Sequence, residues 1–227
     1  NPTVSDFEPV LLAGIGDPEN HSIAGYQANG GYQTLRTILK QSTPDQVIEL
    51  VKASNLRGRG GAGFPTGLKW TFLPEDHPGP IYFCLNADES EPGTFNNRIL
   101  MEQDPHQVLE GLILSCFATQ SQTAYCYLRY EYPLALERLQ RAIDDCYEAG
   151  YLGENILGSG YSLDVTIHRG AAAYICGEET GLIESLEGKR AWPRIKPPFP
   201  AVSGVFGKPT VVNNIETVAC VKHICQR

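Results

Sequence analysis

The stretch IYFCLNADESEPGTF, residues 81–95, joins a short apolar run to a polar and acidic segment. Residues 81–85 are continuously apolar, which is typical of a strand buried on both faces of a parallel sheet. Ligands of such sheets bind beyond the carboxyl ends of the strands, so residues 86–95 are a candidate binding segment. Further strands are expected over residues 125–128 and 163–167, and helices over residues 105–119, 133–148 and 177–186. This alternation predicts an α/β fold with a parallel sheet and flanking helices.

The N-terminal part of the chain has a different pattern. Residues 1–33 are rich in Gly, Asn and Pro and are expected to be irregular, whereas residues 34–40 predict a short helix. Thr43-Pro44-Asp45-Gln46 has the pattern of a capping box with proline at the first helical position. We therefore expect a lead-in over residues 1–43, followed by one α/β domain over residues 44–227.

Composition excludes several classes of protein. The chain carries 18 Lys and Arg against 26 Asp and Glu, a net charge of -8, which argues against a nucleic-acid partner. Its seven cysteines include no Cys-x-x-Cys pair, so we expect a reducing compartment, no disulfide framework and no complete metal site in this chain. The most apolar run, residues 108–118, is too short to span a bilayer, so no direct membrane insertion is expected.

The stretch GRGGAGFPTGLKW, residues 58–70, contains the pattern Gly-x-Gly-x-x-Gly. The dinucleotide-binding fingerprint requires a strand before these glycines and a helix after them. Here a predicted helix precedes them and the turn Pro65-Thr66-Gly67 follows, which excludes the ordinary Rossmann interpretation. A flexible loop and a phosphate or flavin cradle both remain open. The nearby cations, which favour the cradle, are Arg57, Arg59 and Lys69.

Acidic side chains are concentrated in two later segments, and each has a plain structural alternative. Asp88, Glu89 and Glu91 follow the first strand, either as a solvated turn or as hydrogen-bond partners of sugar hydroxyls and ring edges. Carboxylates there would repel an extra phosphate and favour NAD over NADP. Glu178 and Glu179 open a helix, where they either complement its dipole or form a second acidic wall of the pocket.

Two further segments bring a cation, an aromatic ring and amides. Residues 194–200 are either a rigid surface loop or a clamp that uses Lys196 and Phe199. Asn213 and Asn214 precede a helical pattern, so one of them is either an N-cap or an amide ligand. No nucleophile and base stand in a recognisable pattern, and the five histidines do not pair at metal-ligand spacing.

Five motifs occur in the order of one family: GRGGAGFPTGLKW (58–70), CLNADESEPGTF (84–95), YICGEET (174–180), SLEGKR (185–190) with KPPFP (196–200), and GKPTVVNNIET (207–217). The chain resembles the NADH-binding, FMN-containing subunit of respiratory complex I, and the related diaphorase subunits of NAD-linked hydrogenases and formate dehydrogenases. The resemblance runs from about residue 30 to the end. It implies a Rossmann-like α/β domain with FMN and NADH in one pocket.

The resemblance also implies which residues serve each ligand. Those expected to hold FMN are Gly58, Arg59, Gly60, Gly61, Lys69, Asn86, Asp88, Glu89, Ser90, Tyr174, Gly177, Glu178, Glu179, Val212, Asn213, Asn214 and Thr217. Those expected to contact NADH are Phe64, Phe72, Glu91, Glu179, Lys196 and Phe199, with the three phenylalanines around the adenine. No catalytic side chain and no metal ligand are expected in this chain, because the cofactor carries the chemistry.

The implied activity is hydride transfer from NADH to FMN, followed by single-electron transfer to iron–sulfur clusters of a quinone-reducing respiratory complex. An alternative enzyme function is that of a diaphorase subunit of an NAD-linked hydrogenase or formate dehydrogenase. An alternative without enzymatic activity is a non-catalytic scaffold. Expected partners are a thioredoxin-like [2Fe-2S] subunit and further iron–sulfur subunits, on the cytoplasmic side of a bacterial inner membrane or in a soluble cytoplasmic complex. A ubiquitin-like domain and a helical [4Fe-4S] domain are expected to be absent from this chain, which we interpret as a fragment or a partly ordered chain.

Two positions depart from the pattern of the family. The usual Gly-Ala-Gly before Tyr-Ile-Cys is Gly170-Ala171-Ala172 here. Ala172 therefore carries a methyl group at a position where the family has glycine, whose backbone is less restricted. Trp192 stands where the family usually has a small polar residue. Both are expected to reshape the rim of the pocket.

Overall fold

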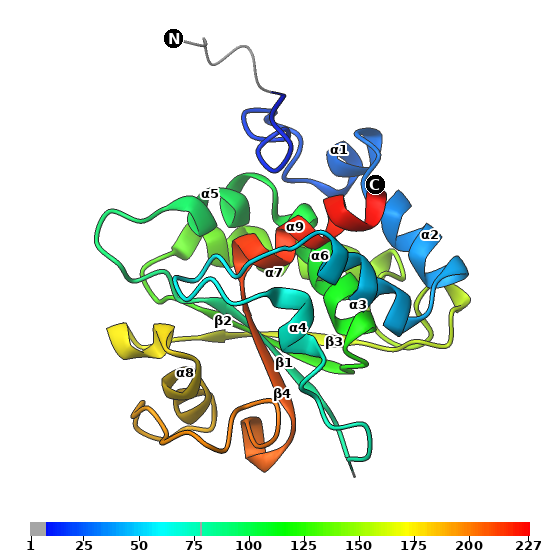
Figure 1. Ribbon diagram of the computed structural model, residues 1–227. Coiled ribbons are helices and arrows are strands. Elements are labelled where there is room, and N and C mark those ends of the chain that lie inside the picture. Colours follow the sequence, from blue (N-terminus) through cyan, green and yellow to red (C-terminus); the bar gives the residue numbers. More distant parts are fainter. Residues whose placement is uncertain (1–7, 78) are drawn as a thin grey trace, which may run out of the picture.

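The computed structural model describes residues 8–77 and 79–227, and these contain one sheet of four parallel strands. The order across the sheet is β3-β2-β1-β4 (Figure 1). The strands are β1 (Tyr82–Ala87), β2 (Thr123–Leu128), β3 (Asp164–Arg169) and β4 (Thr210–Asn214). The three predicted strands are confirmed, with ends shifted by at most two residues, and so is the parallel α/β class.

Helices flank this sheet on both faces. Their bounds are α1 (Ile23–Ala28), α2 (Gln33–Gln41), α3 (Pro44–Ala53), α4 (Thr66–Trp70), α5 (Asn96–Gln103), α6 (Pro105–Ala118), α7 (Pro133–Glu148), α8 (Glu179–Leu186) and α9 (Ile215–Gln226). Three-residue or four-residue 3₁₀ turns are η2 (Ile156–Gly158), η3 (Tyr174–Gly177) and η4 (Val205–Gly207). The helices expected over residues 105–119, 133–148 and 177–186 are confirmed as α6, α7 and α8. Across the described ranges, no helix combines the length and apolar character needed to cross a bilayer.

The side chains of β1 alternate between two hydrophobic cores, as the pleat of a strand requires. Phe83 and Leu85 enter the larger core, which lies against α6 and α9, whereas Cys84 enters a smaller core with Leu182 of α8. Figure 1 shows these helices on opposite faces of the sheet, with α8 alone below it. Both faces of β1 are therefore dry, which explains its continuously apolar sequence.

Strand β4 was not predicted from the sequence. Its residues read Thr-Val-Val-Asn-Asn, too short and too polar at the end to stand out as a strand. In the structure it pairs with β1, and its Val211 and Val212 fill the larger and the smaller core respectively. Tertiary pairing, rather than local pattern, makes this segment a strand.

The chain reverses its direction across the sheet at β1. It passes from β1 to β2 and β3 on one side, and then returns to β4 on the other side of β1. Such a reversal opens a crevice at the carboxyl ends of the two strands that flank it, because the connections leave them in opposite directions. This topology therefore predicts a ligand site beyond the carboxyl ends of β1 and β4, which we call the crevice.

The N-terminal region is more ordered than the sequence suggested. The irregular structure expected over residues 1–33 is wrong for residues 23–28, which form α1 with Ser22 as N-cap. Residues 1–7 lie outside the described residues. Tyr26 and Tyr32 are buried in the larger core, so residues of the lead-in pack on the α/β domain itself. The helix predicted over residues 34–40 and the capping box at Thr43 are both confirmed.

A buried carboxylate of α6 holds this region in place. Glu110 is fully buried, and its oxygens accept hydrogen bonds from the Tyr26 hydroxyl at 2.5 Å and from the backbone N–H groups of Tyr32 and Leu35 at 3.0 Å each. Tyr32 precedes α2 in a left-handed conformation, with φ of 61°, and its own side chain makes no cap. Glu110 therefore acts as the cap of α2 from a different helix.

Replacing Glu110 by alanine is expected to lower the free energy of unfolding by about 3 kcal/mol, because three buried donors lose their acceptor. Urea unfolding of the purified chain measures this difference. Glu137→Ala provides the control, since Glu137 is an exposed residue of α7. Equal effects of the two substitutions would contradict the capping role of Glu110.

Candidate functional site

Asn86 and Asn214 lie side by side at the crevice, since they are paired in the register of the adjacent strands β1 and β4. The sequence analysis placed Asn86 in the loop after the first strand, but it lies within β1, near the end of the strand. Its amide donates to the Gly177 carbonyl at 2.9 Å, and its oxygen accepts from the backbone N–H of Asp88 at 3.1 Å. Asn86 thus ties the end of β1 to the turn before α8.

The glycine loop lies over the start of α9. Gly58 N–H donates to the Phe64 carbonyl at 2.9 Å, closing the loop on itself, and Arg59 N–H donates to the Thr217 hydroxyl at 2.8 Å. Gly61 has φ of +114° and no atom within 4 Å of the position of a Cβ. The loop is therefore a glycine cradle with free space in front of it, beside a helix N-terminus, and this arrangement suits a phosphate.

The turn expected at Pro65-Thr66-Gly67 is wrong in detail, because Thr66 begins the short helix α4. This helix presents Lys69 and Trp70 to β4. The ammonium of Lys69 donates to the Val212 carbonyl at 2.7 Å, and the indole N–H of Trp70 donates to the Asn213 amide oxygen at 2.9 Å. The sequence analysis missed Trp70, although it directly follows Lys69 in the glycine-rich motif.

Two lysines and two glutamates form a charged cluster at the start of α8. Glu179 accepts from Lys69 at 3.1 Å and from Lys196 at 2.7 Å, while Glu178 accepts from Lys196 at 3.2 Å. Burial opposes ionisation of Glu179, but the two lysines outweigh it and hold the pKa of this carboxyl below its ordinary value. Glu178 also caps α8, since it accepts the N–H groups of Thr180 and Gly181 at 2.9 and 2.8 Å. Both interpretations of these glutamates are thus compatible with the geometry.

Asp88 is the unsatisfied acid of the crevice. Its side chain is buried, one oxygen accepts the Ser90 hydroxyl at 3.1 Å, and the other has no partner among the described residues. Burial raises the pKa of Asp88 to about 6, although Ser90 and Arg129 act in the opposite direction. This oxygen can therefore accept a hydrogen bond from a ligand or from a water molecule.

Glu89 has a different orientation from its neighbour. Its carboxylate accepts the N–H groups of Asn97 and Arg98 at 2.9 and 3.1 Å, which caps α5, and also the Tyr132 hydroxyl at 3.1 Å. The guanidinium of Arg129, a residue that the sequence analysis missed, donates to the Glu89 carbonyl at 2.5 Å. The side chain of Glu89 therefore holds the loop in place.

The expected aromatic residues are exposed around the glycine loop and the later proline-rich segment. The rings of Phe64 and Phe72 lie 5.9 Å apart at 52°, and both are about half exposed. Phe199 and Tyr174 are also exposed, as is Glu91. Exposed aromatic side chains cost little to cover with a planar ligand, and they gain apolar burial when one stacks on them.

Of the two asparagines of β4, Asn214 is the N-cap of α9, where its oxygen accepts the Glu216 N–H at 2.9 Å. The structural alternative for this residue is therefore confirmed. Residues 8–77 and 79–227 contain no group of three His, Cys, Asp or Glu side chains that could hold a metal ion.

A protein-family model described as the Nuo51 FMN-binding domain matches residues 51–223. The chain belongs to this family. The match covers both strands that flank the crevice, the glycine loop and α8, so the resemblance inferred from the five motifs is confirmed.

Relatives in this family are similar along almost the whole chain. An NADH-quinone oxidoreductase subunit of Rhizobium meliloti (strain 1021) is 60% identical over 221 residues, which are 97% of this chain and 52% of that protein. The corresponding NADH-quinone oxidoreductase subunit of Aquifex aeolicus (strain VF5) is 55% identical over 215 residues, covering 95% of this chain and 50% of that protein. The chain thus spans about half the length of these relatives.

Solved structures of NAD+-reducing [NiFe]-hydrogenase share the fold. The H2-reduced form superposes with a TM-score of 0.75 at 40% identity, over 85% of this chain and 35% of the hydrogenase chain. The air-oxidized form gives a TM-score of 0.77 at 37% identity, over 97% of this chain and 35% of the other. The Nuo51 FMN-binding domain family and these hydrogenase chains therefore have a common architecture.

The departure from the family pattern at Ala172 has a structural consequence. Ala172 adopts φ of +62°, a left-handed conformation that glycine adopts freely and alanine does not. Ala172→Gly is expected to raise the free energy of unfolding by about 1 kcal/mol. Ala173→Gly is the matched control, because Ala173 has φ of -94° and gains nothing from glycine. Chemical denaturation of both variants tests this, and stabilisation by neither would contradict the strain at Ala172.

The raised pKa of Asp88 predicts a pH-dependent stability. Because the folded chain holds this proton more tightly than the unfolded chain does, ionisation destabilises the fold as the pH rises from about 4 to 6. In the absence of FMN, Asp88→Asn is expected to be more stable than the parent chain by about 2 kcal/mol at pH 7 and no more stable at pH 4. Urea unfolding at the two pH values measures this, and a difference independent of pH would argue against a buried, unpaired carboxylate.

Proposed function

We propose that this chain is the NADH-oxidising flavin module of an NADH-quinone oxidoreductase. In this role it binds FMN in the crevice between β1 and β4 and receives NADH in the same pocket. The observation that carries the proposal is the coincidence, at one topological switch point, of the glycine cradle and the unpaired Asp88 oxygen in a chain of the Nuo51 FMN-binding domain family.

The residues of the crevice suit the chemical groups of FMN. The open space before Gly61 and the N-terminus of α9 accommodate the phosphate, with Arg59 and Lys69 as nearby cations. The free oxygen of Asp88 accepts a hydroxyl or ring N–H group, which satisfies a buried acceptor that the protein leaves without a donor. We assign the remaining FMN contacts to the other residues predicted from the family, with Glu89 contributing through its backbone.

NADH is assigned to the exposed side of the same crevice. Phe64 and Phe72 lie on one segment and Phe199 on another, and we propose that the adenine stacks between them. Lys196 and Glu179, together with Glu91, contact the dinucleotide. The acidic residues around the crevice disfavour the additional phosphate of NADP, since like charges repel at short range.

FMN, when bound, accepts the hydride of NADH and releases electrons one at a time. The chain itself has three tasks: it binds the two ligands, holds them stacked, and excludes water between them. No proton donor is required at the reacting atoms, which accounts for the lack of a nucleophile–base set in the sequence.

The fate of the electrons depends on other parts of the complex. We propose transfer to iron–sulfur clusters held by a thioredoxin-like [2Fe-2S] subunit, by further iron–sulfur subunits, and by a [4Fe-4S] domain that the longer relatives have room for. The quinone-reducing complex would be attached at the cytoplasmic side of a bacterial inner membrane. The hydrogenase structures favour a second candidate, a diaphorase subunit in a soluble cytoplasmic complex. Isolation of the native complex and identification of its other chains distinguishes the two.

The test of the cofactor site is an FMN titration of the purified chain, followed by anaerobic addition of NADH. We expect one FMN per chain and loss of the flavin absorbance on reduction. Gly61→Val is expected to weaken FMN binding at least about tenfold, because its side chain fills the space before the cradle.

Gly160→Val is the matched control for this substitution. Gly160 also has a positive φ, +80°, and free space around its Cβ position, but it lies in a turn before β3. Its backbone strain is therefore similar, without any effect on FMN. If the folded parent chain bound no FMN, the proposed function would be wrong and the scaffold interpretation would replace it.

A further inference from the structure

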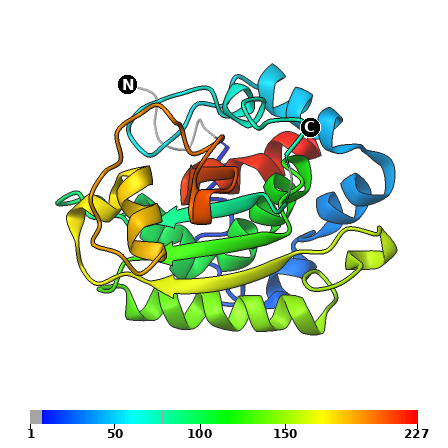
Figure 2. The same cartoon turned by 90° about the horizontal axis from the view of Figure 1, so that it is seen from below.

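Lys196 and Phe199 belong to a segment that hydrophobic burial holds only near its returning end, where Val205 is buried in the smaller core. We call residues 188–207, which connect α8 to β4, the strap; Figure 2 shows it arching over the face of the sheet that α8 covers. Between residues 188 and 199 no side chain is fully buried, and Trp192 and Ile195 are 65% and 90% exposed. Polar contacts must therefore fix the position of this part of the strap.

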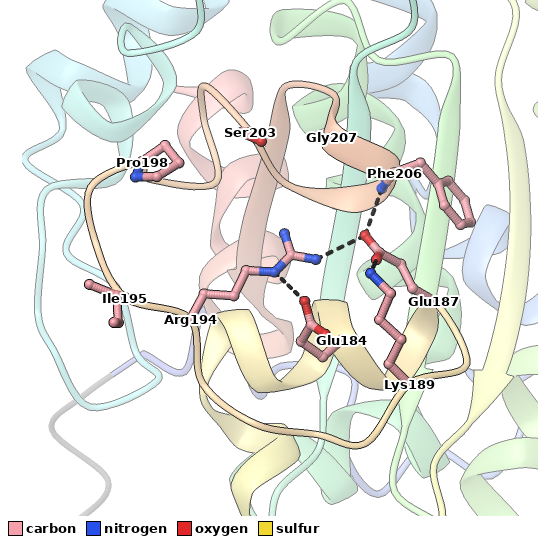
Figure 3. A pocket seen from close by; sticks show the side chains of 9 residues that line it. All are labelled: Glu184, Glu187, Lys189, Arg194, Ile195, Pro198, Ser203, Phe206 and Gly207. Atoms are coloured by element: carbon pink, nitrogen blue, oxygen red, sulfur yellow. Dashed lines mark hydrogen bonds and ion pairs between the residues drawn. The ribbon is translucent and has the colours of Figure 1, made fainter.

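Arg194 makes four of those contacts. Its guanidinium donates to Glu184, to Glu187 at 3.0 Å and to the Gly204 carbonyl at 3.0 Å, and its backbone N–H donates to the Thr180 hydroxyl at 2.8 Å. Figure 3 shows the guanidinium directed at the two glutamates of the α8 region. One side chain thus joins the middle of the strap to α8 and to the returning end of the strap.

Glu187 completes this anchor. The oxygen that accepts from Arg194 also accepts the Phe206 N–H at 2.7 Å, and the second oxygen accepts from Lys189 at 2.6 Å. The Glu187 side chain is only 5% exposed, so its carboxylate is shielded from water, although the Lys189 side chain is 59% exposed. Burial opposes its ionisation, but Lys189, the Phe206 N–H and Arg194 together keep the pKa of Glu187 below its ordinary value.

The strap runs along α8 in the opposite direction to the helix. Arg194 reaches Glu184 and Glu187 near the helix C-terminus, whereas Lys196, two residues later, reaches Glu178 and Glu179 at its N-terminus. Ile195 between them is exposed, as expected when alternate side chains of an extended segment point in opposite directions. The anchor at Arg194 therefore sets where Lys196 stands.

The hollow around Arg194 is not itself a candidate ligand site. Its volume is about 560 Å³, and it shares no lining residue with the predicted FMN and NADH residues. Each of the charged side chains that line it, Glu184, Glu187, Lys189 and Arg194, is paired with another of them. These groups are used to hold the strap.

We propose that Arg194 is a positioning residue for the dinucleotide: anchored on Glu184 and Glu187, it holds Lys196 and Phe199 over the crevice without touching the ligand. This inference rests on the proposed function for the identity of the ligand. It predicts that NADH affinity falls far more than FMN affinity, because the glycine cradle and Asp88 lie on other segments and, of the residues assigned to FMN, Lys196 contacts only Glu178 and Glu179.

Arg194→Gln is expected to raise the half-saturating NADH concentration for flavin reduction about tenfold, with the limiting rate unchanged and the FMN dissociation constant changed less than about twofold. Stopped-flow reduction of the FMN-loaded chain at increasing NADH concentrations separates these quantities. Arg141→Gln is the matched control, since Arg141 is an exposed arginine of α7, outside the strap and its anchor. An unaltered half-saturating NADH concentration, or a loss of FMN affinity as large as the loss of NADH affinity, would overturn the assignment.

A double-mutant cycle tests whether Arg194 acts through Lys196. Lys196→Gln alone is expected to raise half-saturation, and adding Arg194→Gln to it is expected to cause much less than a further tenfold rise. Full additivity would show that the two residues act independently and would overturn the positioning role.

Proteolysis tests the anchor in the absence of either ligand. Trypsin can cut the Arg190–Ala191 bond in both the parent chain and Arg194→Gln, and the variant is expected to be cut at least about tenfold faster because its strap is released. Equal cleavage rates would overturn the inference. If the parent chain bound FMN but NADH failed to reduce it, the proposed function would fail, whereas this experiment would still decide whether Arg194 anchors the strap.

Discussion

Strand β4 pairs with β1 and not with β3, and the geometry of the whole site follows from that pairing. It brings Asn214 opposite Asn86, although the two residues are far apart in the chain. It also leaves the segments after β1 and β4 diverging from a common edge of the sheet, so that the glycine loop, the acidic segment and α9 meet there. Without this pairing, the family motifs would be separate loops with no shared pocket.

The charges near the ends of β1 and β4 suit the anionic ligands that we propose for this acidic protein. The net negative charge of the chain repels a nucleotide, but salt largely screens this repulsion at distances beyond about 10 Å. Inside the crevice, Lys69 and Lys196 both donate to Glu179, which holds each ammonium group in position. A single exposed ion pair would not order such long side chains to the same extent. Backbone amides of the glycine loop and of α9 add partial positive charge without mobile side chains. The ordered positive groups near the crevice therefore outweigh the net negative charge of the chain.

We propose that FMN and NADH are bound by parts of the fold that differ in how they are held in place. The FMN side is built on strand ends and on helices packed over the larger core, with Gly111 of α6 so close to Val218 of α9 that a Cβ would lie 2.2 Å from its carbonyl oxygen. The NADH side uses Lys196 and Phe199 of the strap, where the contacts are mostly polar. A permanently bound cofactor suits the first environment, and a ligand that must leave after each turnover suits the second.

The amino-acid sequence by itself determined the α/β class, the three apolar strands, the capping box at Thr43 and the family, because these depend on local patterns and on motif order. It also placed the acidic segment after the first strand at the carboxyl end of the sheet. Only the tertiary structure decided that Thr-Val-Val-Asn-Asn is a strand, that Glu89 caps α5 while Asp88 is left unpaired, and that Glu110 caps a helix other than its own. These features depend on partners distant in the chain, since a carboxylate or a short strand has no preference that neighbouring residues alone can reveal.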